Sequence, residues 1–92
     1  MFNLGYLPGS DKTLITKTAD TMRAITTSLE WLSPGGLMTV VVYPGHDGGA
    51  EEAGEVARLG GELSPRAFEV QHLRPVNRSA SPPECWAFLK RK

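Results

Sequence analysis

The chain has 92 residues, of which 40% are hydrophobic, and ten Lys and Arg residues balance ten Asp and Glu residues. Such a length allows one domain that buries only roughly 60 to 65% of its unfolded surface, and the zero net charge argues against nucleic-acid binding by bulk electrostatics alone. No apolar stretch approaches the roughly 18 residues of a membrane span, and the start lacks a signal-peptide pattern. The single Cys85 excludes an internal disulfide. We therefore expect a reduced, cytoplasmic protein without a membrane partner.

The chain opens on an apolar pair, Met1 and Phe2, which indicates the end of a strand. A shaped loop is expected over residues 3–12. Because ligands in open α/β sheets bind just outside the carboxyl ends of the strands, this loop is where chemistry is expected. An apolar series at helical spacing then predicts a helix over about 18–32, with Thr16 or Thr18 as its N-cap and its end at the Pro34-Gly35 turn.

The second half of the chain predicts three strands and one helix. Residues 37–43 are rich in β-branched side chains, which favours a central parallel strand with both faces covered. A second helix is predicted over about 49–61, and residues 68–76 and 84–90 are expected to pair as an antiparallel hairpin. The pattern predicts an α/β fold with a mixed sheet that ends in this hairpin, in one partial domain over residues 1–92.

A complete cofactor site is missing from the sequence. A dinucleotide or adenosyl ligand is normally held by a Gly-x-Gly-x-x-Gly turn after a first strand, with an acidic residue about 20 positions later. The glycine pairs here lie at 35–36, 48–49 and 60–61. Only the pair at 35–36 directly precedes a strand-like run, whereas the cofactor turn must follow a strand.

Several short blocks nevertheless occur together in a characteristic order. They are Phe2-Asn3-Leu4-Gly5-Tyr6-Leu7-Pro8-Gly9 with Asp11-Lys12, Thr16-Lys17, Leu32-Ser33-Pro34-Gly35-Gly36-Leu37, Tyr43-Pro44-Gly45-His46-Asp47-Gly48-Gly49 with Glu51-Glu52, and Pro82-Pro83. In this order they resemble the rRNA methylases, class I S-adenosylmethionine-dependent methyltransferases that methylate 5-aminomethyluridine at the wobble position of tRNA. The resemblance covers essentially the whole chain but only the carboxyl-terminal half of the family's Rossmann-like domain.

The resemblance implies a tRNA methyltransferase that uses S-adenosylmethionine and reads the anticodon region of tRNA. It assigns catalytic roles to Asn3, Tyr6 and His46. Asn3 and Leu4 would accept the hydrogens of the substrate amine and contact the cofactor, and Tyr6 would stack on the pyrimidine. From the residues alone, Asn3 also fits a turn cap and His46 also fits a hydrogen bond within its own loop.

Further substrate contacts are expected at Gly5, Tyr43, Arg74 and Arg78. Residues 70–92 contain five basic side chains and one acidic side chain, so this part of the chain is locally basic. Arg74 and Arg78 are candidates for phosphate contacts, and a solvated surface is the alternative. No metal site is expected, because His46 and Asp47 stand alone and His72 lies on a separate strand.

An incomplete sheet would leave the strand at 37–43 as a nearly bare edge, and such an edge invites pairing with another chain. Whether the isolated chain is an enzyme therefore stays open. One hypothesis is a fragment of a methyltransferase whose missing amino-terminal half pairs along that edge. The other is an inactive half-domain that acts as an interaction module, as a homodimer or with a separate cofactor-binding chain.

Overall fold

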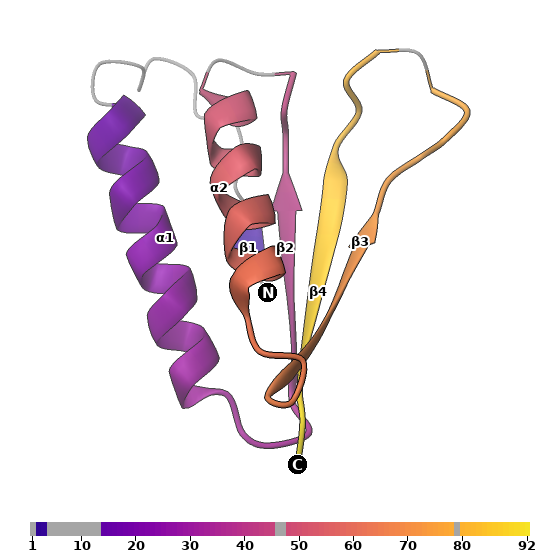
Figure 1. Ribbon diagram of the computed structural model, residues 1–92. Coiled ribbons are helices and arrows are strands. Elements are labelled where there is room, and N and C mark those ends of the chain that lie inside the picture. The colour runs from indigo at the N-terminus through magenta and orange to yellow at the C-terminus, as the bar shows by residue number, and fades with distance from the viewer. Residues whose placement is uncertain (1, 4–13, 46–47, 79) are drawn as a thin grey trace.

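The computed structural model describes residues 2–3, 14–45, 48–78 and 80–92 and contains four strands and two helices (Figure 1). In chain order they are β1 (Phe2–Asn3), α1 (Leu14–Trp31), β2 (Leu37–Val42), α2 (Gly49–Glu62), β3 (Phe68–Leu73) and β4 (Glu84–Lys90). Neither described helix combines the length and the apolar composition needed to cross a membrane.

The strands form one mixed sheet in the order β1-β2-β4-β3. Strand β1 runs parallel to β2, whereas β4 is antiparallel to both β2 and β3. The last strand therefore inserts between β2 and β3, and β1, β2 and β3 all point the same way. The predicted mixed sheet and its final antiparallel hairpin are confirmed.

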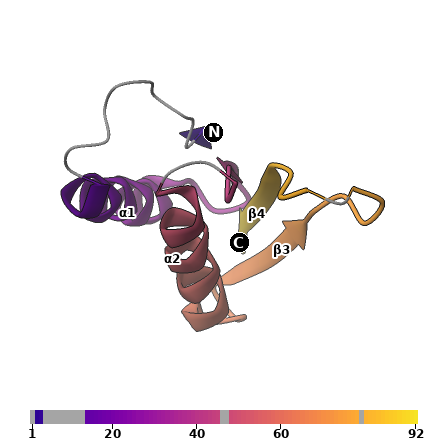
Figure 2. The same ribbon diagram turned by 90° about the horizontal axis from the view of Figure 1, so that it is seen from above.

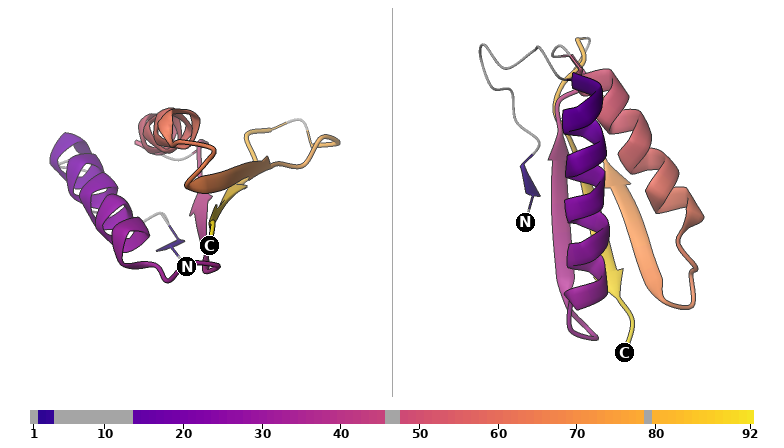
Figure 3. Two further views of the ribbon diagram at one scale, coloured as in Figure 1. Left: turned by 60° about the horizontal axis from the view of Figure 1, so that its bottom comes forward. Right: turned by 90° about the vertical axis from the view of Figure 1, so that its left-hand side faces the viewer.

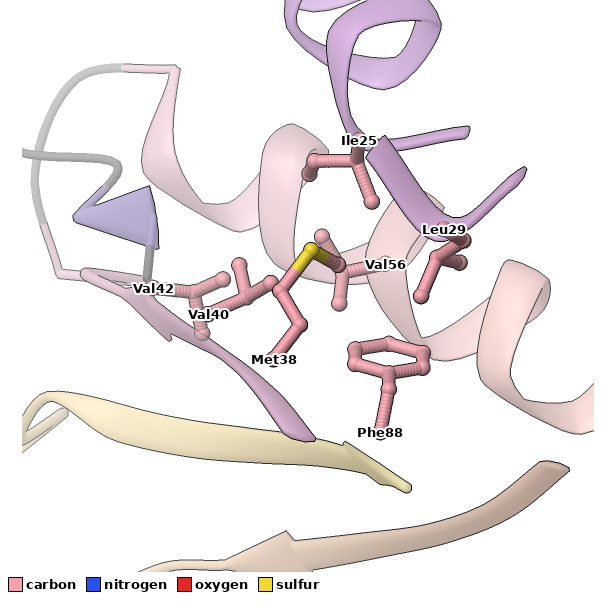
Figure 4. Packing of buried hydrophobic residues seen from close by; sticks show 7 residues of the cluster. All are labelled: Ile25, Leu29, Met38, Val40, Val42, Val56 and Phe88. Atoms are coloured by element: carbon pink, nitrogen blue, oxygen red, sulfur yellow. The ribbon is translucent and has the colours of Figure 1, made fainter. Parts of the chain in front are cut away.

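Both helices cover the same face of the sheet (Figures 2 and 3). The core lies between them and the two central strands, where seven side chains are buried (Figure 4): Ile25, Leu29, Met38, Val40, Val42, Val56 and Phe88. Alternate residues of β2 enter this core, as the period of two along a strand requires. The core is built from one face of the sheet only.

None of the described elements covers the opposite face of the sheet, which corrects the expectation that both faces of β2 are covered. Leu37 on β2 is 60% exposed, Leu73 on β3 is 51% exposed and Leu89 on β4 is 39% exposed. These residues alternate with the buried ones, so their side chains face away from the helices. The core therefore accounts only for the alternate apolar residues Met38, Val40 and Val42 of β2.

Helix α1 begins at Leu14, four residues before the predicted start, and neither Thr16 nor Thr18 is its N-cap. Thr18 lies inside the helix and is buried. Tertiary packing thus outweighs the modest helix propensity of threonine.

Strands β2 and β3 end earlier than predicted, at Val42 and Leu73. For β3 the cause lies in the sequence, because Pro75 has no backbone N–H to offer a neighbouring strand.

Helix α2 ends close to the expected position, with the Leu63 N–H donating to the Leu59 carbonyl at 3.1 Å. Gly60 lies within α2 where an added Cβ would meet Val70 and Trp86 at 3.1 and 3.2 Å, so it keeps this helix close to the hairpin.

We expect Phe88→Ala to lower the free energy of unfolding by about 3 to 5 kcal/mol, because the ring is fully buried and its loss leaves a cavity. The neighbouring Leu89→Ala, on the open face, should cost about 1 kcal/mol or less. Urea unfolding followed by circular dichroism measures both values. Equal losses for the two variants would contradict the one-sided core.

Two glycines of α2 should respond in opposite directions to alanine. An added Cβ at Gly49 would lie 1.8 Å from the Tyr43 carbonyl oxygen, whereas Gly54 has nothing within 4 Å. Gly49→Ala should therefore destabilise the fold by more than about 1 kcal/mol, and Gly54→Ala should stabilise it by about 0.5 to 1 kcal/mol. Thermal melting compares them, and a stable Gly49→Ala variant would refute the close approach.

Candidate functional site

The carboxyl ends of three strands meet at one edge of the sheet. Because β1, β2 and β3 run in the same direction, Asn3, Val42 and Leu73 end their strands at this edge. Strand β4 starts there, with Glu84 paired to Val42. This is the edge at which open α/β sheets bind their ligands.

One register row near this edge crosses the whole sheet. Asn3 pairs with Val41, Val41 pairs with Cys85, and Cys85 pairs with Leu73. Neighbouring strands lie about 4.8 Å apart, so the backbones of Asn3 and Cys85 are roughly 10 Å apart. A ligand the size of two adjacent nucleotides would reach from one to the other.

A shallow groove of about 340 Å³ lies on this row. Its lining consists of Val41, Leu73, Arg74, Pro75, Pro83, Glu84 and Cys85. The floor residues Val41, Leu73 and Cys85 alternate with the buried positions, so the groove opens on the face away from the helices. The groove thus combines three apolar floor residues with one cationic side chain, Arg74, and one anionic side chain, Glu84.

His72 contacts Glu84, one of the residues that line the groove. Its Nε2 atom lies 2.5 Å from Glu84 Oε1, and its ring stacks on Trp86 with centroids 4.0 Å apart and planes 7° from parallel. His72 and Trp86 are direct cross-strand partners. Sequence reasoning missed this cluster, since the three residues meet only once the register of the hairpin is known. The hydrogen bond holds the Glu84 carboxylate at the start of β4.

The connection from β2 to α2 returns tightly to the sheet. Gly48 precedes α2 with φ of 74°, a conformation that favours glycine, and Gly49 packs directly on the Tyr43 carbonyl. Glu51 and Glu52 occupy the first turn of α2. Their negative charge opposes an anionic ligand at this helix end, although helix amino termini otherwise attract phosphate.

The structure gathers part of the predicted site. The backbone of Asn3, the half-buried Tyr43 and Arg74 lie at the same edge of the sheet. Arg78 is exposed in the connection between β3 and β4 and does not line the groove. Leu4, Gly5, Tyr6 and His46 lie outside the described residues, and their roles stay predictions.

The described residues do not fit an adenosyl cofactor. Within the described ranges, positive φ occurs at two glycines, Gly35 and Gly48. Gly35 follows α1, and its N–H donates to the Lys90 carbonyl at the opposite edge of the sheet, whereas Gly48 leads into the acidic first turn of α2. Neither makes the strand, glycine turn and helix arrangement that holds such a ligand. The same residues also contain no group of three or more potential metal ligands.

Comparisons with known proteins agree with this partial fold. The family described as "Putative rRNA methylase" matches residues 1–89. A chloroplastic tRNA (mnm(5)s(2)U34)-methyltransferase of Arabidopsis thaliana is 41% identical over 81 residues, which are 88% of this chain and 30% of that protein. The chain thus spans less than a third of this curated relative.

Two solved structures are similar over nearly the whole chain. A "putative rRNA-methylase" from Clostridium thermocellum has a TM-score of 0.84 and 37% identity, and the match covers 98% of this chain and 48% of that one. A "putative methyltransferase" from Streptococcus mutans, solved in complex with SAH, has a TM-score of 0.80 and 36% identity over 97% and 48% of the two chains. Together with the family match over residues 1–89, these likenesses show that the chain belongs to the rRNA methylase family.

Proposed function

We propose that this chain forms the acceptor-binding half of an S-adenosylmethionine-dependent RNA methyltransferase that N-methylates the 5-aminomethyl group of wobble uridine in tRNA. The observation that carries the proposal is the 41% identity to a tRNA (mnm(5)s(2)U34)-methyltransferase over 88% of this chain. The position of Asn3 at the carboxyl end of β1 supports it, because this is where the sheet presents ligands.

The chain's own part in the reaction is to hold the acceptor. A nitrogen attacks a methyl group in line, so its lone pair must be neutral and correctly aimed. The side-chain oxygen of Asn3 and the carbonyl of Leu4 accept the two amine hydrogens in this proposal, which orients the lone pair and stabilises the positive charge that develops on nitrogen. S-adenosylmethionine supplies the methyl group from the part of the family domain that this chain does not contain.

The remaining loop residues complete the acceptor site in the proposal. Tyr6 stacks on the uracil ring, and Gly5 allows the backbone to approach it closely. Tyr43, directly after β2, forms a wall of the pocket. His46 binds the substrate or takes up the proton that the amine releases, since an imidazole can accept a proton near neutral pH.

The groove beside Arg74 offers a place for a neighbouring nucleotide in the anticodon region. Its apolar floor of Val41, Leu73 and Cys85 suits the face of a base, and it lies on the same register row as Asn3. Arg74 at the rim is placed to contact a phosphate. Arg78, exposed in the same connection, is a second phosphate contact in the proposal.

A second candidate function is a non-enzymatic interaction module. The observation in its favour is that the match covers only 48% of the solved relatives and that the described residues hold no cofactor cradle. A dimer that forms without affinity for S-adenosylmethionine would favour this alternative.

Asn3→Ala should lower turnover by about 10²- to 10³-fold, because an acceptor for the reacting amine is lost. Cofactor binding should change little. The assay uses this chain fused to the unmatched part of the Clostridium thermocellum relative, with unmodified tRNA and 5-aminomethyluridine-containing tRNA as substrates. Asn77→Ala, an exposed asparagine in the connection between β3 and β4, is the matched control. Unchanged turnover in Asn3→Ala would remove this residue from the mechanism.

Arg74→Ala should weaken tRNA binding about tenfold at low salt and reduce the slope of log affinity against log salt by about 0.7. Arg66→Ala removes the same charge in the turn before β3, at the opposite edge of the sheet, and should leave both values unchanged. Fluorescence anisotropy of a labelled anticodon stem-loop over a salt series gives the slopes. Equal effects of the two substitutions would return Arg74 to a solvated surface role.

A further inference from the structure

Two side chains of opposite charge flank the base of the connection between β3 and β4. The last register pair of this hairpin joins Leu73 to Cys85. The next position brings Arg74 across from Glu84, because opposite residues of antiparallel strands follow one register. Side chains that face each other in this way have Cβ atoms roughly 5 Å apart, within reach of an ion pair. Arg74 and Glu84, which also line the same groove, are therefore placed to neutralise each other.

The Glu84 carboxylate takes a different partner. Its Oε1 atom lies 2.5 Å from Nε2 of His72, which is the diagonal neighbour of Glu84 across the hairpin. Diagonal neighbours are farther apart than opposite ones, so the glutamate side chain leans along the strands to make this contact. The ion pairs among the described residues include none that involves Arg74. The carboxylate is thus engaged with the imidazole and not with the arginine across the hairpin.

Trp86 holds the imidazole in the orientation that makes this contact. It is the direct cross-strand partner of His72, and the two rings stack with their centroids 4.0 Å apart. The indole in turn packs against α2, where an added Cβ at Gly60 would meet its Cζ3 atom at 3.2 Å. The Glu84 side chain is 19% exposed, so the contact is partly shielded from water and strengthened by it. The stack therefore favours the contact with His72 over a contact with Arg74.

Arg74 is left as a cation without an acidic partner in the part of the chain that the structure describes. Residues 74–83 contain two arginines, Arg74 and Arg78, and no acidic residue. An unpaired guanidinium can bind a phosphate through two parallel hydrogen bonds. A guanidinium paired with Glu84 would first have to release the carboxylate, whose charge would also repel the phosphate.

We propose that His72 is a positioning residue that diverts Glu84 from Arg74 and thereby leaves the guanidinium free for a phosphate of RNA. His72 acts through Glu84 and does not itself touch the RNA. The RNA ligand rests on the proposed function, whereas the diversion of Glu84 rests on the contacts of the hairpin alone.

The test measures the binding of a labelled anticodon stem-loop by fluorescence anisotropy. His72→Ala should weaken binding about five- to tenfold, because the released carboxylate pairs with Arg74. Adding Glu84→Gln to this variant should restore the affinity to within about twofold of the unaltered chain, since the competing charge is gone. His72→Gln keeps an N–H that can donate to Glu84 and should bind RNA as the unaltered chain does.

Glu69→Gln is the matched control. It removes an equal charge from the same hairpin, where Glu69 pairs with Arg91 at 3.5 Å. Added to His72→Ala, it should leave the RNA affinity as weak as before. Circular dichroism melts show that each variant is folded at the temperature of the assay.

Phenylglyoxal labelling reads the Arg74 guanidinium without RNA. Mass spectrometry of the peptide that contains Arg74 should show ready labelling in the unaltered chain and slower labelling in His72→Ala, because a carboxylate then covers the guanidinium. Glu84→Gln should return the labelling of His72→Ala to the rate of the unaltered chain.

The outcomes separate the diversion from the RNA ligand. Equal labelling and equal affinity in His72→Ala and the unaltered chain would overturn the inference. Restoration by Glu69→Gln as full as that by Glu84→Gln would also overturn it, because the effect would then be one of net charge. The expected labelling without any binding of RNA would uphold the diversion and count against the proposed function.

Discussion

The fold depends on the burial of one side of β2. Met38, Val40 and Val42 pack beneath both helices, and all six residues of β2 pair with β4. This strand therefore fixes the position of the hairpin on one side and the end of β1 on the other. The register row from Asn3 to Leu73 passes through Val41, the residue between two of these buried positions. Packing on one face of β2 thus sets the spacing of the candidate site on the other face.

Much of this arrangement could be predicted from local patterns. The spacing of Ile25 and Leu29 predicts α1, and the principle that ligands bind at the carboxyl ends of parallel strands places Asn3, Tyr43 and Arg74 at one edge. The His72 cluster and the groove over Cys85 could not be predicted, because they depend on pairing between residues distant in sequence. The early start of α1 does not follow from the sequence, because Thr16 and Thr18 fit an N-cap as well as a helix interior.

The exposed apolar groups agree with a chain that matches about half of each solved relative. The helix-covered face has its own core, whereas Trp31 on α1 and the opposite face of the sheet leave apolar groups exposed. Each solved relative contains about as much chain again beyond the match. In the proposed function the chain positions the methyl acceptor at one edge of the sheet, and the part of the family domain beyond the match binds the methyl donor. The two reactants then meet at the boundary between the two halves, beside Asn3.

The most direct test of this division is calorimetric titration with S-adenosylhomocysteine. The chain is titrated alone, after circular dichroism and a cooperative melt have shown that it is folded, and again in the presence of the unmatched part of the Clostridium thermocellum relative. The account predicts no binding by the folded chain alone and one bound ligand per complex. Stoichiometric binding by the chain alone would contradict it, because the cofactor site would then lie within these 92 residues.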